Sequence, residues 1–331
     1  MKAGFLIDKN RFECREVPTP TIAEGETLLR VSACGFCGSD IHDAARGCKE
    51  PKIPGHEFAG VVEEIRGDAR GFKKGDAAVI NPLMTCGTCE YCVSGREHLC
   101  HARAVIGCQT PGGFAQFAKV PTDRLRRIPK GLKPEYATLS DPLAVTMHAC
   151  DLAGDLKGKN VLVYGAGTLG LFMVQMLKRR GAAKVVVSDV AAPRLKAAAK
   201  MSATLVVDAS RDPEYASVKD IVFDVTVELA GGQAPTLGLA IDRVRRGGLV
   251  LLVAQRPPTE IKCAQLLFNE RRLQGVFGQT SRNFDDALAL LATGKVNADA
   301  IVTDLFPLER IQEAFDRARS TDSVKVVVKP S

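Results

Sequence analysis

The most specific chemical signal in this 331-residue sequence is a group of four cysteines within fifteen residues. They follow the pattern C-x2-C-x2-C-x7-C, at Cys86, Cys89, Cys92 and Cys100. Thiols spaced so closely cannot easily form two unstrained disulfides. Four thiolates can instead surround one tetrahedral Zn²⁺ ion and fill all of its coordination positions. The pattern therefore predicts a structural zinc site, with no position open for a substrate.

A second set of potential metal ligands is scattered along the chain. Cys37 lies in segment 34–42, His56 lies in segment 54–60, and Asp141 begins an Asp-Pro-Leu sequence. Taken alone, each is more often a packed structural side chain. Together they offer sulfur, nitrogen and oxygen ligands that leave one zinc position free, as catalytic zinc requires. The remaining cysteines show no such spacing, and we expect them to be structural or incidental: Cys14, Cys34, Cys48, Cys108, Cys150 and Cys263.

A glycine-rich turn in the second half has the pattern of a dinucleotide-binding motif. A buried strand over 160–164 is followed by Gly165-Ala166-Gly167-Thr168-Leu169-Gly170 and then by an apolar helix that ends before Gly181. In this context Gly165 makes the tight turn, Gly167 lets the backbone approach a pyrophosphate, and Gly170 lets the helix pack on the strand. The helix N-terminus adds N–H groups and positive potential for the phosphates.

The end of the next predicted strand bears on which dinucleotide is bound. That strand, 184–188, leads to Asp189, nineteen residues after Gly170. A carboxylate there accepts hydrogen bonds from a ribose 2′-hydroxyl and repels a 2′-phosphate, which favours NAD over NADP. Arg194 can stack on or hydrogen-bond to the same ribose, so NADP stays open as an alternative.

The surrounding elements predict an α/β fold in two domains. After residue 160, predicted strands (184–188, 204–207, 221–229, 249–254 and 273–277) are separated by helical patterns (171–178, 191–201 and 235–244). This alternation predicts a doubly wound parallel sheet. The first ~140 residues are rich in glycine and short strands, which indicates a β-rich partner domain.

Composition excludes several classes of protein. With 46% apolar and 25% charged residues the chain is an ordinary globular one, and its longest apolar runs are too short to span a membrane. Only a short apolar stretch, residues 3–7, follows the N-terminal lysine, so we expect no secretory signal and a cytoplasmic location. The net charge of +7 is mild, and the absence of tryptophan leaves little to stack on nucleic-acid bases. Basic clusters at 178–180 and 243–246 are predicted at helix ends, where they complement the helix dipole.

At this point the chain resembles the zinc-containing medium-chain dehydrogenases, the superfamily of alcohol and polyol dehydrogenases. The resemblance spans nearly the whole sequence. It rests on CGFCGSDIH, GHEFAGVVEEI, the four-cysteine segment, DPLAVTMHA, GAGTLG with Asp189, and the closing LERIQEAFDRA…KVVVKP pattern. Within the superfamily it is most similar to the polyol (sorbitol-type) and threonine dehydrogenases.

The resemblance implies a split catalytic domain of GroES-like fold and a Rossmann domain that binds NAD. We expect residues 1–145 and 280–331 to form the first, with a zinc lobe over 84–103, and residues 146–279 to form the second. The C-terminal part should contribute helices over 281–294 and 308–320 and a returning strand over 324–328. Relatives are dimers or tetramers, so a homodimer or homotetramer is expected.

Carried over residue by residue, the resemblance also assigns the catalytic zinc site. Cys37 matches the thiolate ligand and His56 the imidazole ligand. Glu57 matches a neighbouring carboxylate that moves onto the metal in some relatives and stays behind its ligands in others. Asp40 matches the acid that orients His56.

Asp141 stands where polyol dehydrogenases carry Glu and threonine dehydrogenases carry Asp. Because Asp is one methylene shorter, direct and water-mediated coordination remain alternatives. Charge favours Cys37, His56 and Asp141 as ligands, since one thiolate and one carboxylate balance Zn²⁺. Glu57 or water would then be exchangeable.

The implied reaction removes a proton and a hydride from an alcohol. Ser39 matches the hydroxyl that accepts the substrate proton, and His42 matches the outer histidine that passes it to solvent by way of the cofactor ribose. The resemblance places this chemistry in the cleft between the two domains. A polyol or other secondary alcohol is the first substrate class and L-threonine the second, followed by a primary alcohol or sugar phosphate. A non-catalytic NAD-binding redox sensor is the alternative from a different class.

Overall fold

The computed structural model describes residues 1–330, which form two compact units. The first consists of residues 1–141 and of the described residues from Thr280 onward, and the second is Pro142–Gln279. The boundary between them falls inside helix α4 (Ser140–Ala153). The predicted boundary after residue 145 lies in the same helix, where no loop marks the transition.

The second unit is built on a six-stranded sheet in the order β12-β11-β10-β13-β14-β15. All neighbouring strands in it are parallel, which confirms the predicted α/β class. Its strands are β10 (Asn160–Tyr164), β11 (Lys184–Asp189), β12 (Leu205–Asp208), β13 (Phe223–Glu228), β14 (Val244–Leu252) and β15 (Arg272–Gly275). Its helices are α5 (Thr168–Arg179), α6 (Ala192–Lys200), α7 (Thr236–Arg243) and α8 (Cys263–Leu267), with a 3₁₀ turn at Ala216–Val218.

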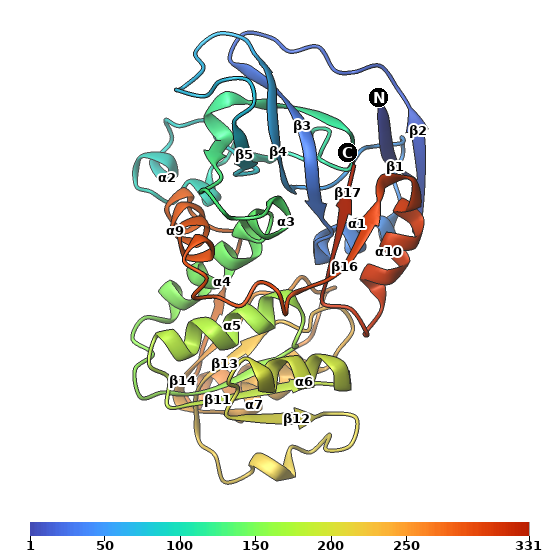
Figure 1. The fold of residues 1–331 in the computed structure, drawn as a ribbon. Coiled ribbons are helices and arrows are strands. Elements are labelled where there is room, and N and C mark those ends of the chain that lie inside the picture. The colour runs from blue at the N-terminus through green and yellow to red at the C-terminus, as the bar shows by residue number, and fades with distance from the viewer. Residues whose placement is uncertain (331) are drawn as a thin grey trace. The chain divides into compact units, whose positions relative to one another are not determined.

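The central strand shows why this sheet forms. Val161, Leu162 and Val163 of β10 are completely buried, as expected for a strand covered on both faces. Helices α5 and α6 lie together on one side of the sheet (Figure 1). Helix α5 ends at Arg179, and Gly181 follows with a left-handed φ of 77°, which terminates the helix without strain.

Strand β14 differs from its prediction. It begins at Val244 instead of residue 249, so Arg245 and Arg246 lie in a strand and not at a helix end, as predicted. The reason is that Val244 is buried and pairs with Phe223 of β13, and Arg245 beside it forms a 2.9 Å ion pair with Asp224 of that strand. Only Arg243 lies in the last turn of α7.

The first unit is built on a seven-stranded sheet in the order β16-β17-β3-β4-β5-β9, with β8 paired to β3. Its strands are β1 (Lys2–Asp8), β2 (Arg11–Glu16), β3 (Glu26–Gly35), β4 (Glu57–Ile65), β5 (Ala77–Ile80), β6 (Leu83–Met84), β7 (Ala104–Val105), β8 (Phe117–Pro121), β9 (Leu125–Arg127), β16 (Val302–Pro307) and β17 (Lys325–Lys329). Its helices are α1 (Gly38–Arg46), α2 (Glu90–Val93), α3 (Pro134–Ala137), α9 (Ser281–Ala292) and α10 (Ile311–Arg319), with 3₁₀ turns at Glu97–Leu99, Thr122–Arg124 and Leu308–Arg310.

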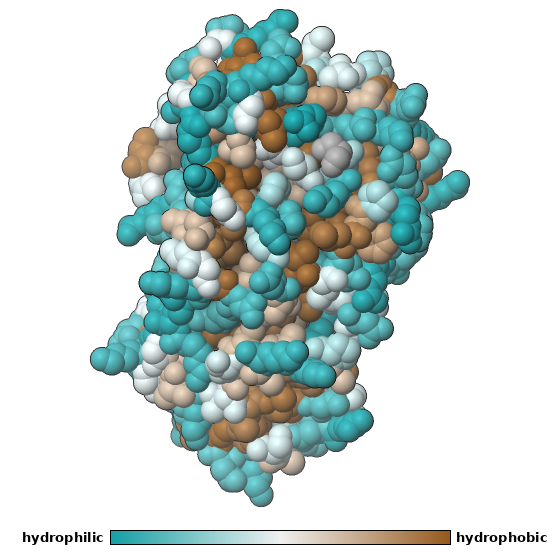
Figure 2. Space-filling view, viewed as in Figure 1, coloured by the Kyte–Doolittle hydropathy of each residue, from teal (hydrophilic) through white to brown (hydrophobic). Residues whose placement is uncertain are grey.

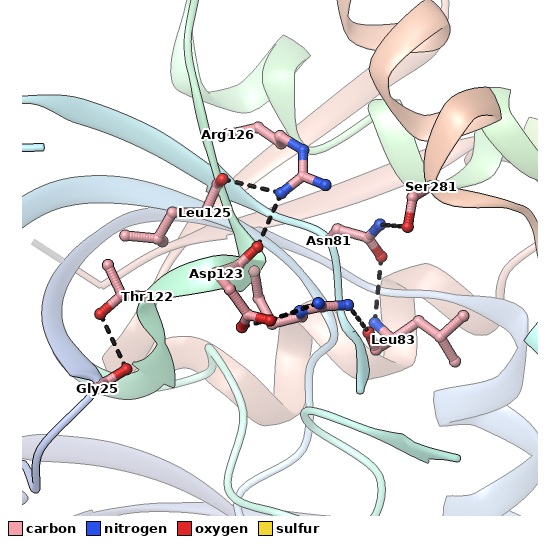
Figure 3. Close-up of polar contacts among 9 residues, drawn as sticks. Gly25, Asn81, Leu83, Thr122, Asp123, Leu125, Arg126 and Ser281 are labelled. Carbon is pink, nitrogen blue, oxygen red and sulfur yellow. Dashed lines mark hydrogen bonds and ion pairs between the residues drawn. The ribbon is translucent and has the colours of Figure 1, made fainter. Parts of the chain in front are cut away.

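The C-terminal segment completes this sheet and its core. Strand β17 runs antiparallel to β3, with Val327 opposite Gly35. Phe315 of α10 packs on Phe12 at a ring-centroid distance of 4.8 Å. Polar contacts fix the place where the chain re-enters the unit: Asn81 accepts a hydrogen bond from Leu83 and donates one to Ser281 at the start of α9 (Figure 3).

The visible face of the molecule is mostly hydrophilic (Figure 2). Apolar side chains gather over the edge strand β12, where Leu205 and Val206 are exposed. Within residues 1–330, no helix has both the length and the apolar character needed to cross a membrane.

Candidate metal centres and cofactor site

Strand register brings the first candidate site together. Strands β3 and β4 are antiparallel, and Gly35, the last residue of β3, pairs with Glu57, the first residue of β4. Cys37 follows the end of β3 and His56 precedes the start of β4, so two segments distant in sequence meet at one end of the sheet. The ligand atoms of Cys37, His56 and Glu57 lie within 4.8 Å of one another.

Asp40 lies behind two members of this group. One of its carboxylate oxygens accepts the backbone N–H of Cys37 at 2.9 Å, and the other lies 3.7 Å from Nδ1 of His56. Asp40 is only 4% exposed, so its charge acts in an environment that screens it weakly. The geometry allows Asp40 to fix both the start of α1 and the orientation of the imidazole.

The surroundings of His56 attract positive charge. Burial by itself lowers the pKa of this histidine, but the charge of Cys37 and the carboxylate of Asp40 together raise the pKa well above its ordinary value. A field that stabilises a proton on the imidazole also stabilises a metal cation beside it. The donor set of thiolate, imidazole and carboxylate therefore fits zinc.

Glu57 has a cationic partner that the sequence analysis did not identify. The ammonium of Lys325, from β17, forms a buried ion pair with its carboxylate and donates a hydrogen bond to the carbonyl of Phe36 at 2.8 Å. Burial raises the pKa of Glu57 to about 6, an effect that Lys325 and His56 oppose and the nearby Asp141 carboxylate reinforces. Burial lowers the pKa of Lys325, but the charges of Glu57 and Cys37 outweigh it and raise that pKa. The sequence signal is weak, because β17 has a lysine at each end and only Lys325 is buried.

Asp141 lies near the group without belonging to it. It is 7% exposed, in the first turn of α4, and its charge acts on Glu57. Its carboxylate is not among the ligand atoms that converge within 4.8 Å. Its direct coordination of a metal therefore stays a prediction.

Ser39 and His42 lie on helix α1, which the sequence analysis did not predict. Both are half-buried, and they are three residues apart, so they lie on neighbouring positions of one helix face. Burial and the charge of Arg46 lower the pKa of His42, which leaves its imidazole neutral and able to accept a proton near pH 7.

Cys108 is a further residue at this site, although its sequence position gave no signal. Its sulfur lies 4.0 Å from Nδ1 of His56, on the same ring nitrogen that faces Asp40. The thiol is half-buried. It is therefore not incidental to the surroundings of His56.

The four-cysteine segment forms a second cluster, in a lobe that contains α2. The ligand atoms of all four cysteines lie within 4.8 Å of one another. The sulfur–sulfur distances are 3.9 Å for Cys86–Cys92, 3.5 Å for Cys89–Cys92 and 3.6 Å for Cys86–Cys100. Four sulfurs at about 2.3 Å from a tetrahedral zinc lie about 3.8 Å apart, so the spacing fits the ion. Backbone hydrogen bonds from Thr88 and Cys89 lower the pKa of the Cys86 thiol to about 6, which favours the thiolate.

The glycine-rich turn leaves space where a phosphate would approach. A Cβ on Gly170 would lie 1.9 Å from the carbonyl oxygen of Gly165, so the start of α5 packs there against backbone. Gly165 itself has a φ of 100°, and a Cβ on it would lie 2.8 Å from the backbone nitrogen of Ala230. Nothing lies within 4 Å of a Cβ on Gly167, and Thr168 and Leu169 are half-exposed. This pattern of two crowded glycines and one open glycine fits a dinucleotide pyrophosphate.

Asp189 is tied to this turn. Its carboxylate accepts the backbone N–H of Ala166 at 2.7 Å and that of Ala191 at 2.9 Å. Arg194 follows on α6 and is half-buried. Beside Asp189, a cavity of about 600 Å³ is lined by Val190, Ala209, Tyr215, Ala234, Pro235 and Thr236, among others. Its size and mainly apolar lining suit a nucleoside.

Comparison with known proteins gives the family. Residues 23–130 match the alcohol dehydrogenase GroES-like domain, and residues 168–293 match the zinc-binding dehydrogenases. The chain is 33% identical to an L-threonine 3-dehydrogenase of an Anaeromyxobacter species, with 99% of each chain covered. It is 32% identical to a sorbitol dehydrogenase of Bacillus subtilis, with 100% of this chain and 98% of the relative covered.

A solved structure from Sinorhizobium meliloti, described as a zinc-binding dehydrogenase bound to NADP, superimposes with a TM-score of 0.90 at 30% identity and covers 99% of each chain. Similarity of this extent, over the whole chain and in both fold and sequence, establishes the relationship. The chain belongs to the zinc-containing medium-chain dehydrogenase superfamily and is an oxidoreductase.

Proposed function

We propose that the chain oxidises a secondary alcohol or a polyol to the ketone, with NAD⁺ as hydride acceptor and release of one proton. The observation that carries this proposal is the convergence of Cys37, His56 and Glu57 beside the helix that bears Ser39 and His42. Bound zinc supplies the Lewis acidity that makes a hydroxyl proton easier to remove. The dinucleotide supplies the hydride acceptor.

In this proposal Cys37, His56 and Asp141 hold the catalytic zinc, and Glu57 or water occupies an exchangeable position. One thiolate and one carboxylate balance the charge of Zn²⁺. A second carboxylate would make the site anionic, but Lys325 compensates the charge of Glu57. Glu57 can therefore lie beside the metal without weakening its Lewis acidity, which supports a role as an exchangeable ligand.

Ser39 accepts the substrate proton and His42 receives it further out. The lowered pKa of His42 supports this order, because a neutral imidazole is the form that takes up a proton. Asp40 keeps the imidazole of His56 oriented. The four-cysteine lobe holds a second, structural zinc ion through Cys86, Cys89, Cys92 and Cys100, which gives two zinc ions per chain.

NAD is the proposed cofactor because the carboxylate of Asp189 repels a 2′-phosphate. Gly165, Gly167, Thr168, Leu169 and Gly170 would bind the pyrophosphate, with Asp189 and Arg194 at the ribose. A related structure contains NADP, so the preference of this chain between NAD and NADP has to be tested by experiment. Initial rates with NAD⁺ and NADP⁺ should give a kcat/KM at least about tenfold higher with NAD⁺.

L-Threonine is the second candidate substrate. Two observations favour it: the Asp-Pro sequence at Asp141, and an L-threonine 3-dehydrogenase at 33% identity over nearly the full chain. The deciding experiment follows NADH formation by the zinc-loaded protein with polyols, simple secondary alcohols, primary alcohols and L-threonine. A clear preference for polyols or secondary alcohols supports the proposal, and a preference for L-threonine replaces it with the second candidate.

Zinc content separates these enzymes from a non-catalytic NAD-binding sensor on the same fold. Two zinc ions per chain support catalysis, and one supports a structural remnant. We also propose a homodimer or homotetramer in the cytoplasm, without a nucleic-acid or membrane partner. Light scattering after gel filtration measures the oligomeric state.

A further inference from the structure

A buried ion pair lies at the carboxyl end of β13, apart from both metal centres. Glu228 is completely buried, and the side chain of Arg256 is 7% exposed. Nη1 of Arg256 lies 3.1 Å from Oε1 of Glu228. Neither residue carries a role in the proposed chemistry.

The two side chains hold the loop that follows β13 at several points. Oε1 of Glu228 accepts the backbone N–H groups of Ala230 and Gly231 at 3.1 and 3.0 Å and the hydroxyl of Thr236 at 2.7 Å. The guanidinium of Arg256 donates to the carbonyl of Ala234 and, at 3.3 Å, to the hydroxyl of Thr236. Residues 230–236 are therefore fixed at both ends by one pair.

This loop adopts a conformation that needs such support. Gly231 and Gly232 have left-handed φ values of 63° and 55°. Glycines lose more backbone freedom on ordering than other residues, so ordering a loop with two in succession has an extra entropic cost that its contacts must offset. The carboxylate of Glu228 and the guanidinium of Arg256 supply those contacts.

The same loop borders the cofactor site on two sides. Ala234, Pro235 and Thr236 line the 600 Å³ cavity together with Val190, the residue after Asp189. Ala230 abuts the glycine-rich turn, because a Cβ on Gly165 would lie 2.8 Å from its backbone nitrogen. A displacement of the loop would change both the cavity wall and the turn.

Stability alone does not explain the pair. Oε2 of Glu228 and Nε of Arg256 are buried with no hydrogen-bond partner among the described residues. Buried ion pairs are often no more stabilising than well-packed apolar residues, and unpaired buried polar atoms add a cost. Apolar residues, however, cannot bind two backbone N–H groups, a hydroxyl and a carbonyl at once.

We propose that Glu228 and Arg256 are positioning residues that keep loop 230–236 in the conformation that binds the adenosine part of the dinucleotide. The inference rests on the proposed function, since it assumes that the cavity beside Asp189 receives a nucleoside. If the loop without its support is in the binding conformation about a tenth of the time, the apparent Kd rises about tenfold. The reacting carbon and the zinc site are not affected directly, so kcat at saturating cofactor should change little.

The test uses Arg256→Gln and Glu228→Gln in the zinc-loaded protein, with Arg245→Gln as the matched control. Arg245 pairs with Asp224 at the opposite end of the same two strands, so the control removes an ion pair from the same sheet. Kd values for NADH and for ADP-ribose, which lacks the nicotinamide, are measured by titration. Hydrogen exchange at Ala230 and Gly231 reports loop order without any cofactor.

We expect Arg256→Gln and Glu228→Gln to raise the Kd of NADH and of ADP-ribose by about tenfold or more, with kcat within about threefold of wild type. Arg245→Gln should bind both ligands as wild type does. Arg256→Lys, which keeps the charge, should recover part of the affinity and provides a second variant if Arg256→Gln does not fold.

Two outcomes overturn the inference while leaving the proposed function intact. If hydrogen exchange at Ala230 and Gly231 becomes faster while the Kd values stay unchanged, the order of the loop does not determine cofactor affinity. A Kd raised for NADH but not for ADP-ribose would move the effect away from the adenosine part. If the wild-type protein binds neither NADH nor ADP-ribose, the proposed function is refuted, and this inference is refuted with it. That outcome is distinguishable from the other two because it is seen in the wild-type protein, without any variant.

Discussion

Lys325 and Glu57 face each other inside the first unit, with side chains only 2% and 1% exposed. Gly35 makes this contact possible, because a Cβ on it would lie 2.8 Å from Oε2 of Glu57 and 2.9 Å from Cε of Lys325. Strands β17 and β4 both pair with β3 at this point, so β17 supplies a cation beside the candidate metal centre.

Removing the cation should be costly. Lys325→Met leaves the Glu57 carboxylate buried without its partner, and the loss of one member of a buried pair typically costs about 3–5 kcal/mol. We expect a loss of that size in the free energy of unfolding, measured by urea titration of the zinc-loaded protein. The double variant Lys325→Met with Glu57→Gln removes both charges and should recover most of the loss. A cost below about 1 kcal/mol for Lys325→Met would show that the pair contributes no more than a surface ion pair.

A substitution at Asp141 can test whether its carboxylate binds zinc directly or only contributes to helix α4. Asp141→Asn removes the charge but keeps the size, so a direct zinc ligand should lose one zinc ion per chain and most of its turnover. Asp151→Asn, further along α4, is the control because Asp151 belongs to the second unit and pairs with Arg180 there. Zinc is counted by elemental analysis. Full zinc content and turnover in Asp141→Asn would make Glu57 the third protein ligand.

Much of the fold was predictable because it follows from local patterns. The run Val161-Leu162-Val163 and the glycines after it predict a buried strand, a turn and a helix. Strand β10 has the predicted bounds, and α5 begins three residues before the predicted helix and ends one residue after it. The four-cysteine cluster was predictable for the same reason, because its four thiols lie within fifteen residues of sequence.

The features that sequence reasoning missed depend on long-range register. Lys325 and Cys108 reach the surroundings of Glu57 and His56 only through the pairing of β17 with β3 and the packing of distant loops. Helix α1 was missed because Gly38 and Ser39 are weak helix formers, and its start depends on the contact between Asp40 and Cys37. Strand β14 was predicted too short because two glycines interrupt its apolar pattern.

The four-cysteine lobe should hold zinc independently of the catalytic centre. Cys86→Ser removes the thiol that receives the most hydrogen bonds, and we expect a loss of one zinc ion per chain. The exposed Cys263 provides the control variant Cys263→Ser, which should keep both ions. Zinc release is followed with a colorimetric chelator. Loss of both ions from Cys86→Ser would mean that the lobe is required for the whole first unit to fold.

The proposed proton path predicts that a change at Ser39 lowers kcat without changing the Kd of the cofactor. Ser39→Ala removes the hydroxyl that accepts the substrate proton, and loss of a general acid–base group typically lowers kcat by about 10²–10⁴. The Kd of NADH should stay within about twofold of wild type, since Ser39 lies outside the second unit that carries the glycine-rich turn. Unchanged turnover would exclude Ser39 from the path.

The ionisation of Glu97 should make the free energy of unfolding depend on pH. Its carboxylate, in the 3₁₀ turn of the four-cysteine lobe, accepts the backbone N–H of Ser281 at the start of α9. Burial raises the pKa of Glu97, but this hydrogen bond and others outweigh it and lower the pKa below the ordinary value of 4.5. Because the folded pKa is below the unfolded one, the ionised carboxylate stabilises the protein above pH 4.5, and its contribution is lost as the pH falls through the folded pKa.

Urea unfolding of wild type and Glu97→Gln between about pH 3 and pH 7 measures this contribution. The difference in free energy of unfolding should be constant above about pH 5.5 and shrink below pH 4.5. Zinc content is measured at each pH, and only samples with equal zinc content are compared, because zinc ligands release the metal when they are protonated. Glu90→Gln is the control, since Glu90 lies in the same lobe with a 71% exposed side chain and should leave the profile unchanged. A carboxylate that stabilises the fold through its charge must stop doing so once it is protonated. If the difference in free energy of unfolding between wild type and Glu97→Gln stayed constant down to pH 3, the contact with Ser281 would not depend on the charge of Glu97.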